Sequence, residues 1–365
     1  MATRKRRRKK RTIKLSRILF LLCLVAIVVL GFQYLKYSNA QKPIQKESEE
    51  IAFTVNTGES MRTVTNHLEE QGIIRDAQMA YYFAKFSNLD EVKAGEFVLN
   101  KNMSTKEIFE TLNDASKAIV YDATVTIIEG DWAKDIAKKI AAVTNVTQED
   151  LLNLWNDETY IHSLMNTYPF ITEDVFNENI RIKLEGYLAP NTYKFYQETT
   201  AEEVTEKILN QSKIVFDKFE EDFKKSSYSI HELYTLASII QYEAGKIEDM
   251  KMIAGVFYNR LNISMPLQSS ATVCYAIDLD KENEDWIGCE VNGDFDSPYN
   301  TYKYQGLPPG PIFNAGEDAF DAVLHPTDND YYYFLADVFN DGSIHYAKTL
   351  EEHLVNQEKY LGGKY

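Results

Sequence analysis

The stretch Ser229-Ile-His-Glu-Leu-Tyr-Thr-Leu-Ala-Ser-Ile-Ile-Gln-Tyr-Glu-Ala-Gly245 decides the fold of the C-terminal half of this 365-residue chain. Ser229 and Glu232 form a capping box, which predicts that a helix begins here. Apolar side chains such as Leu236 and Ile240 then recur at helical spacing and predict a buried face. Gly245 can end the helix, because glycine readily adopts the left-handed conformation.

Glu243 does not fit a simple surface position in this helix. It follows Leu236 by seven residues and Ile240 by three, so its side chain projects beside the buried face. Desolvation raises the pKa of a carboxyl group in such a place, as a general acid working near neutral pH requires. A glutamate at a helix end is more often a boundary residue or a hydrogen-bonded core group. The helix alone therefore leaves both roles open.

Working outward to the N-terminus, the sequence joins a basic arm to an acidic body. Eleven of the 39 Lys and Arg residues lie before residue 37, and no Asp or Glu occurs before Glu47. The rest of the chain carries 28 basic residues against 55 acidic ones. A phosphate-binding surface needs a basic field, so this balance argues against nucleic acid as a partner.

An uncharged, largely apolar stretch over residues 18–35 follows the basic arm of residues 1–17. Its length predicts a single transmembrane helix, and the positive-inside rule places the arm in the cytoplasm. The remainder would then lie outside the cell membrane, joined to the helix by a polar linker over residues 36–50. Ser38-Asn39-Ala40 resembles a signal-peptide cleavage site, so a cleaved signal remains the alternative.

A weak internal repeat with an offset of 72 residues comes next. Phe53-Thr-Val-Asn-Thr-Gly58 and Val125-Thr-Ile-Ile-Glu-Gly130 each predict a strand and a glycine turn, followed by two helices. This order resembles LysM-like modules, which bind cell-wall glycans, although a structural spacer remains open. We expect an α+β chain with one module over residues 51–120, a second unit with a connector over 121–180, and a catalytic domain over 181–365.

The C-terminal half contains several further motifs in series. In chain order, they are Leu184-Glu-Gly-Tyr-Leu-Ala-Pro-Asn-Thr-Tyr193, Leu236-Ala-Ser-Ile-Ile-Gln-Tyr-Glu-Ala-Gly245, Ile253-Ala-Gly-Val-Phe-Tyr-Asn-Arg-Leu261, Met265-Pro-Leu-Gln268, Ser297-Pro-Tyr-Asn-Thr-Tyr302, Gly306-Leu-Pro-Pro-Gly-Pro-Ile312, Tyr331-Tyr-Tyr-Phe-Leu-Ala-Asp337 and His345-Tyr-Ala-Lys-Thr-Leu350. In this order they resemble the endolytic murein transglycosylase (YceG-like) family. With the apolar stretch and the repeat, the resemblance covers nearly the whole chain.

The resemblance implies an enzyme that cuts peptidoglycan glycan strands between N-acetylmuramic acid and N-acetylglucosamine. Glu243 would be its catalytic acid and base, the muramic 6-hydroxyl would attack, and a 1,6-anhydro end would result. Family members often have two glutamates in the sequence E-x-E, whereas this chain has Gln241 before Glu243. Ser269-Ser-Ala-Thr272 also departs from the family, which commonly has an aspartate there. Peptidoglycan synthases and other wall-assembly membrane proteins are the implied partners, and no cofactor or metal is implied.

Substrate-orienting roles are expected for a larger set of polar and aromatic residues. By similarity to the motifs of lytic transglycosylases, or as groups that bond N-acetyl groups or stack on sugars, they are Gln268, Asn300, Thr301, Tyr302, Tyr187, Tyr193 and Glu185. For Glu185, a structural ion-pair role is favoured over that of a polar wall of the groove. Arg260 is expected in an ion-pair and capping role, and His345 and His353 in structural roles. A disulfide between Cys274 and Cys289 is as consistent with the sequence as two free thiols.

Two rival functions follow from the same residues. Gln241 and Ser270 motivate a catalytically degraded scaffold that binds peptidoglycan without cutting it. A true hydrolase, in which water attacks in place of the 6-hydroxyl, would leave reducing ends. The products distinguish the three functions.

Overall fold

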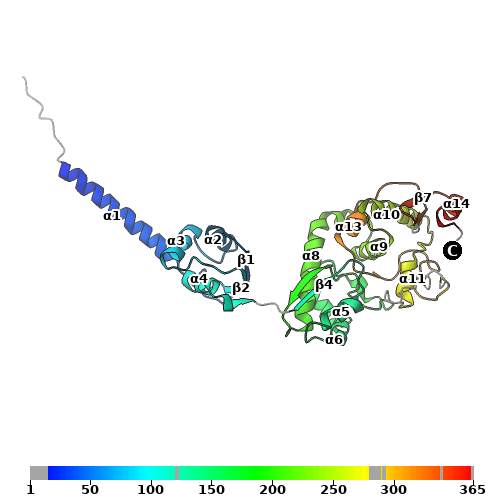
Figure 1. Cartoon of the computed structure of the whole chain (residues 1–365), viewed down its shortest axis with the longest axis horizontal. Helices are drawn as coiled ribbons and strands as arrows, with labels where there is room; N and C mark the ends of the chain where they lie inside the picture. Colours follow the sequence, from blue (N-terminus) through cyan, green and yellow to red (C-terminus); the bar gives the residue numbers. More distant parts are fainter. Residues whose placement is uncertain (1–14, 120–122, 279–288, 290–292, 338–339, 363–365) are drawn as a thin grey trace, which may run out of the picture. The chain divides into compact units, whose positions relative to one another are not determined.

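The computed structural model describes residues 15–119, 123–278, 289, 293–337 and 340–362. The chain forms two compact units, Met1–Val120 and Tyr121–Tyr365, which are described separately here (Figure 1). The expected basic arm lies outside the described residues up to residue 14. The helices and small antiparallel sheets of the two units agree with the expected α+β class.

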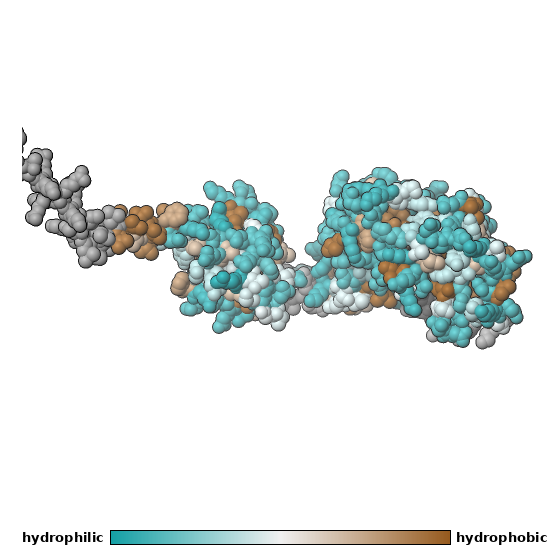
Figure 2. Space-filling model, turned by 90° about the horizontal axis from the view of Figure 1, so that it is seen from above, coloured by the Kyte–Doolittle hydropathy of each residue, from teal (hydrophilic) through white to brown (hydrophobic). Residues whose placement is uncertain are grey.

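The first unit begins with helix α1, Leu15–Ala40, which includes the apolar stretch. Figure 2 shows part of this helix as an exposed hydrophobic surface. Among the described side chains of α1, the large apolar ones that are at least half exposed are Leu22, Leu24, Val25, Ile27, Val28, Val29, Leu30, Phe32, Tyr34 and Leu35. Among the residues described, no helix meets the length and hydropathy needed to cross a membrane.

The expected linker over residues 36–50 is fixed to the first unit. Helix α1 continues to Ala40, whose carbonyl accepts a hydrogen bond of 3.0 Å from the Thr105 hydroxyl. The Arg75 guanidinium donates to the backbone carbonyls of Lys42, Pro43 and Ile44. The acceptors in these contacts are backbone carbonyls, which every residue has. The residue types in this segment therefore could not predict that it is held against the unit.

The rest of the first unit packs three helices and a short 3-10 turn on a small antiparallel sheet. The strands are β1 (Glu50–Val55), β2 (Gly95–Asn100) and β3 (Ala118–Ile119), in the order β1-β2-β3. The helices are α2 (Met61–Glu70), α3 (Ala77–Phe86), α4 (Thr105–Asn113) and η1 (Ala115–Lys117). The side chains of Phe53, Val64 and Phe109 are fully or almost fully buried in its core, so the unit has a core of its own.

The second unit contains the remaining elements in chain order. They are β4 (Ala123–Ile127), α5 (Ala133–Ala141), α6 (Gln148–Leu154), α7 (Glu158–Leu164), η2 (Glu173–Phe176), β5 (Asn191–Phe195), α8 (Ala201–Lys225), α9 (Ile230–Glu243), α10 (Ile247–Asn262), α11 (Ser270–Ala276), α13 (Glu317–Leu324), β6 (Tyr333–Ala336), β7 (Ile344–Ala347) and α14 (Leu350–Leu361). Its sheets are the antiparallel pairs β4-β5 and β6-β7.

No boundary between compact units falls near the expected one at residue 180. Strand β4 pairs antiparallel with β5 from Ala123 opposite Phe195 to Ile127 opposite Asn191. Trp155, on the expected second module's side, lies in the same hydrophobic core as Ile240 in α9. The expected second module is therefore built into the same unit as the expected catalytic domain.

Both halves of the repeat nevertheless have the expected local order. Gly58 and Gly130 adopt left-handed φ values of 79° and 78° after β1 and β4. Each turn leads through at least two helices to an antiparallel returning strand, β2 in the first case and β5 in the second. The glycines match because L residues with a side chain rarely adopt this conformation.

Helices α9, α10 and α13 pack together and place the end of α9 beside the loop before α11. The capping box of Ser229 and Glu232 starts α9 as expected. The helix ends at Glu243 because Ala244 is extended, with φ −151° and ψ 150°. The expected left-handed Gly245 is wrong, since this residue is not among those with positive φ.

Candidate acid-base site

Glu243 is the last residue of α9, and its half-buried carboxyl group faces an open cavity of about 460 Å³. The cavity is lined by Glu243, Arg260, Leu267, Gln268, Ser270, Tyr302, Tyr333, Phe334, Leu335, Ala336, Leu350, His353, Leu354 and Gln357. These residues come from α9, α10, the loop before α11, the start of α11, the turn that contains Tyr302, β6 and α14. The cavity thus combines one carboxyl group with aromatic, amide and apolar walls.

The environment of Glu243 fits a general acid. Burial raises the pKa of its carboxyl group above the ordinary value, while the Ser269 hydroxyl and the positive charge of Arg260 act in the opposite direction. Ser269 Oγ donates to Glu243 Oε1 at 2.6 Å. The group is therefore held in one orientation, with a proton affinity shifted toward neutral pH.

Ser269 is itself held by a buried network of hydroxyl groups. Its backbone N–H donates to Thr301 Oγ1 at 3.1 Å, and Thr301 Oγ1 lies 2.9 Å from Thr272 Oγ1. Ser269, Thr272 and Thr301 are all buried. Thr301 therefore holds Ser269, which in turn contacts Glu243. It does not line the cavity, in contrast to its expected contact with the substrate.

Gln268 and Tyr302 are the expected substrate residues that line the cavity with Glu243. Gln268 has a left-handed backbone with φ 54°, and its N–H donates to the Thr301 carbonyl at 3.1 Å. Asn300 is fully buried, and its amide donates to the carbonyls of Gly293 and Phe295. Asn300 thus shapes the loop that presents Tyr302 and does not line the cavity.

The remaining expected substrate residues lie in the core, away from this cavity. The Tyr187 hydroxyl is 2.7 Å from His231 Nδ1, and the Tyr193 hydroxyl donates to the Ala189 carbonyl at 2.6 Å. Both side chains are almost fully buried. Their positions make them packing residues, because a buried tyrosine uses its hydroxyl on a protein partner.

Glu185 is a buried structural carboxyl group in place of a groove wall. It accepts hydrogen bonds from the backbone N–H of Ala133 at 2.8 Å and from Asn314 Nδ2 at 3.1 Å. Burial raises its pKa to about 8, opposed by the Ala133 bond and by the charge of Arg181. It ties the start of α5 to the loop before α13.

Arg260 and His353 are cavity residues that the sequence argument placed in other roles. Arg260 donates from Nε to the Tyr332 carbonyl at 2.6 Å and from Nη1 to the Leu267 carbonyl at 2.7 Å. Among the described residues, no carboxylate forms an ion pair with it, so the expected ion pair is wrong. His353 stacks on Tyr333 with ring centroids 5.3 Å apart, and burial followed by the charge of Arg260 lowers its pKa.

The departure from the family pattern at Gln241 falls outside the cavity. Gln241 Oε1 accepts a hydrogen bond from the backbone N–H of Gly316 at 2.9 Å, at the start of α13. The side chain does not line the cavity that contains Glu243. Gln241 therefore joins α9 to the start of α13.

The structure also joins Cys274 in α11 to Cys289 by a disulfide, which the sequence left open. This bond links the helix that follows Ser269 to the chain before Asn300. Within the described residues, no group of three or more His, Cys, Asp or Glu side chains is placed to hold a metal ion.

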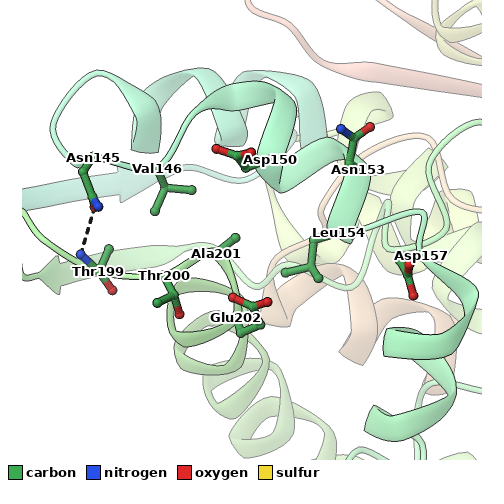
Figure 3. A pocket seen from close by; sticks show the side chains of 10 residues that line it. All are labelled: Asn145, Val146, Asp150, Asn153, Leu154, Asp157, Thr199, Thr200, Ala201 and Glu202. Atoms are coloured by element: carbon green, nitrogen blue, oxygen red, sulfur yellow. Dashed lines mark hydrogen bonds between the residues drawn. The ribbon is translucent and has the colours of Figure 1, made fainter.

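A second cavity of about 490 Å³ lies between the loop after α5, helices α6 and α7, and the start of α8 (Figure 3). Its polar groups serve the backbone. Asn145 Oδ1 accepts from the Thr199 N–H at 2.9 Å, and Asp157 caps α7 by accepting from Tyr160 N. It has no counterpart of the constrained acid, so the cavity at Glu243 is the candidate functional site.

An α+β unit with one constrained carboxylic acid in an open cavity defines a candidate acid-base catalyst. A family model described as the YceG-like family matches residues 53–359, so the chain belongs to that family. This confirms the expected resemblance.

Two curated relatives are both named endolytic murein transglycosylase. The protein of Bacillus subtilis (strain 168) is 36% identical over 340 residues, covering 92% of each chain. The protein of Streptococcus pneumoniae serotype 2 (strain D39) is 33% identical over 365 residues, covering 96% of this chain and 65% of its own. The crystal structure of a putative yceG-like protein from Listeria monocytogenes is 35% identical, with a TM-score of 0.59 over 85% of this chain and 99% of that one. The expected enzyme class is that of these named relatives.

Proposed function

We propose that this chain is an endolytic lytic transglycosylase that cleaves the bond between N-acetylmuramic acid and N-acetylglucosamine in nascent glycan strands. The observation that carries the proposal is Glu243, a half-buried carboxyl group with a raised pKa in an open cavity. The names of the relatives support the same class of reaction.

The chemistry needs one carboxyl group that acts twice. Protonated Glu243 donates its proton to the glycosidic oxygen, and the bond from that oxygen to C1 of the muramic residue breaks. The resulting carboxylate takes the proton of the muramic 6-hydroxyl as this oxygen bonds C1, which closes the 1,6-anhydro ring. Because Ser269 occupies Oε1, Oε2 is the oxygen that we assign to proton transfer. A second carboxylate, as in ordinary glycosidases, is unnecessary.

The cavity walls suggest how a glycan strand is held. The Gln268 amide offers both a donor and an acceptor for an N-acetyl group, and the exposed ring of Tyr302 offers a face for a sugar. Leu350 and Leu354 form an apolar wall from α14. This arrangement fits a polymer of N-acetylated sugars that enters an open cavity.

We also infer that α1 attaches the chain to the cell membrane. Its described apolar side chains from Leu22 to Leu35 are exposed, and exposed apolar surface of this extent is covered by another phase or molecule. The basic arm before it favours a single-pass anchor with a cytoplasmic N-terminus. Attachment would place the enzyme beside peptidoglycan synthases, and the glycan-binding role of the LysM-like units stays a prediction.

The test is mass spectrometry of muropeptides after the full-length protein, in detergent, is incubated with uncrosslinked glycan strands. The matched variant is Glu243→Gln, which keeps the size of the side chain and removes its titrating proton. We expect 1,6-anhydro ends with the unmodified protein and a loss of at least about a hundredfold in the variant. Equal turnover by the variant would remove Glu243 from the mechanism. Reducing ends would support a hydrolase, and binding without products would support a scaffold.

A further inference from the structure

Two aromatic side chains lie exposed on the outer side of α3 in the first unit. Phe86 is 80% exposed and Tyr82 is 39% exposed. Their rings stack with centroids 6.4 Å apart, one helical turn from each other. A phenylalanine this exposed lacks the favourable free energy of apolar burial, and together with Tyr82 it forms a continuous exposed aromatic surface.

This aromatic pair flanks the end of α1. Phe83, one residue after Tyr82 and three before Phe86, contacts Tyr37 of α1 with ring centroids 6.5 Å apart. Lys36 of α1 also pairs with Asp76, the N-cap of α3, at 2.9 Å. Helical spacing therefore places Tyr82 and Phe86 on the same side of the line along which α3 meets α1.

The aromatic pair and the apolar surface of α1 lie in the same compact unit. The exposed apolar side chains of α1 run to Leu35, only two residues before Tyr37, which is about 3 Å along a helix axis. Thr105 and Arg75 hold the chain after α1 against the unit. No flexible linker separates the two surfaces, so whatever covers α1 also approaches α3.

We propose that Tyr82 and Phe86 form an interfacial contact that seats the first unit on the lipid bilayer, an inference that rests on the membrane attachment of α1 proposed above. Tyrosine side chains concentrate where acyl chains meet headgroups, because they combine apolar area with a polar hydroxyl, and phenylalanine is among the residues that amphipathic helices bury at this boundary. The two rings would hold the first unit at a fixed distance from the bilayer surface.

Aromatic partition, and not charge, drives this contact. Lys85, between the two rings in sequence, already lies 3.8 Å from Asp90. The exposed Glu91 next to Asp90 lies 4.0 Å from Lys93 in the same way, so these charges offset one another and supply little attraction to anionic lipid. The contact should therefore form on zwitterionic phosphatidylcholine vesicles and persist at high salt.

The test uses single tryptophan substitutions in the full-length protein, reconstituted in phosphatidylcholine vesicles with bromine-labelled lipids. Phe86→Trp keeps an aromatic ring at the proposed contact. Phe32→Trp reports on α1, and Val98→Trp reports on β2, where the native side chain is 44% exposed. The unmodified protein gives the background of its three native tryptophans. We expect tryptophan fluorescence to be quenched at positions 32 and 86 but not at position 98. At position 86, the quenching should be strongest for bromines near the headgroups.

The other outcomes separate the two proposals. Quenching at 32 without quenching at 86 overturns the interfacial contact and leaves the attachment through α1 in place. No quenching at 32 overturns the attachment and the contact together. Quenching at 86 that disappears in high salt contradicts aromatic partition as its cause. Cleavage of soluble strands is measured separately, so none of these outcomes depends on catalysis.

Discussion

The hydroxyl group of Ser269 acts directly on the proposed acid, because it donates to Glu243 Oε1 at 2.6 Å. Glu243 must be protonated to donate, so activity falls as pH rises through its pKa. The Ser269 bond lowers that pKa. We expect Ser269→Ala to move the alkaline loss of activity to higher pH. The maximal rate should fall about ten- to a hundredfold, as a hydrogen bond to a charged group disappears.

The measurement for this prediction is the pH profile of anhydro-product formation, from acid to alkaline buffers. Ser269→Thr is the matched control, since it keeps a hydroxyl on the same carbon and should leave the alkaline limb near its original position. An alkaline limb that stays unchanged in Ser269→Ala would mean that the bond does not act on the proton of Glu243.

At this scale, the sequence pointed to the proposed acid but not to its surroundings. Helical spacing places Glu243 beside the buried face that Leu236 marks, and the resemblance of the motif then favoured the acid role over that of a boundary residue. Ser269 reaches Glu243 from a loop and Arg260 lines the cavity from a separate helix, and no periodicity connects these segments to α9. Tyr187 was misassigned because a motif shows which residues are present, whereas only packing shows that its ring faces the core.

Helix α10, which carries Arg260, depends on a glycine in its interior. A Cβ at Gly255 would meet the Thr327 carbonyl oxygen and the Asn329 side chain. Alanine favours helix by about 1 kcal/mol over glycine, yet we expect Gly255→Ala to destabilise the fold by about 1–3 kcal/mol, because the loop must move away. Chemical denaturation gives the free energy of unfolding. Gly245→Ala, where a Cβ meets nothing within 4 Å, is the control, and equal stability of both variants would contradict the close packing.

Elements whose signals are local were predictable. The capping boxes at Ser104, Thr200 and Ser229 start α4, α8 and α9, because the cap and its partner lie three residues apart. The pairing of β6 with β7 gave no such local signal, since it joins Tyr333 to Ala347 across 14 positions of the chain. The sequence showed these segments only as two separate motifs.

The whole molecule differs most from the sequence-based expectation in its domain boundaries. The expected boundary at residue 180 separates β4 from β5, although the two strands pair along five residues each. The local repeat was visible because it recurs at a constant offset, whereas the shared core was not, since contacts between distant segments leave no periodic pattern. The second repeat therefore became part of the larger unit that holds Glu243.

This difference gives a prediction for truncated chains. Residues 121–365 should unfold in one cooperative transition and retain the formation of anhydro ends, because they keep the core complete. Residues 181–365 should not fold, since β5 loses β4 and the core loses Trp132 and Trp155 with their neighbours. Each large buried side chain contributes about 1.5–3 kcal/mol, so losing several exceeds a domain's usual stability of about 5–15 kcal/mol.

Circular dichroism on heating and mass spectrometry of the products measure both properties on the same preparations. The full-length protein in detergent is the reference for the transition and for the rate on soluble strands. If residues 181–365 melted cooperatively and released anhydro ends, the core would be divisible at the predicted boundary, and the first half of the second unit would be a separate module. If neither fragment folded, the unit before residue 121 would have a role in folding. The longer fragment retains the complete core around Glu243, so a missing core could not explain its failure to fold.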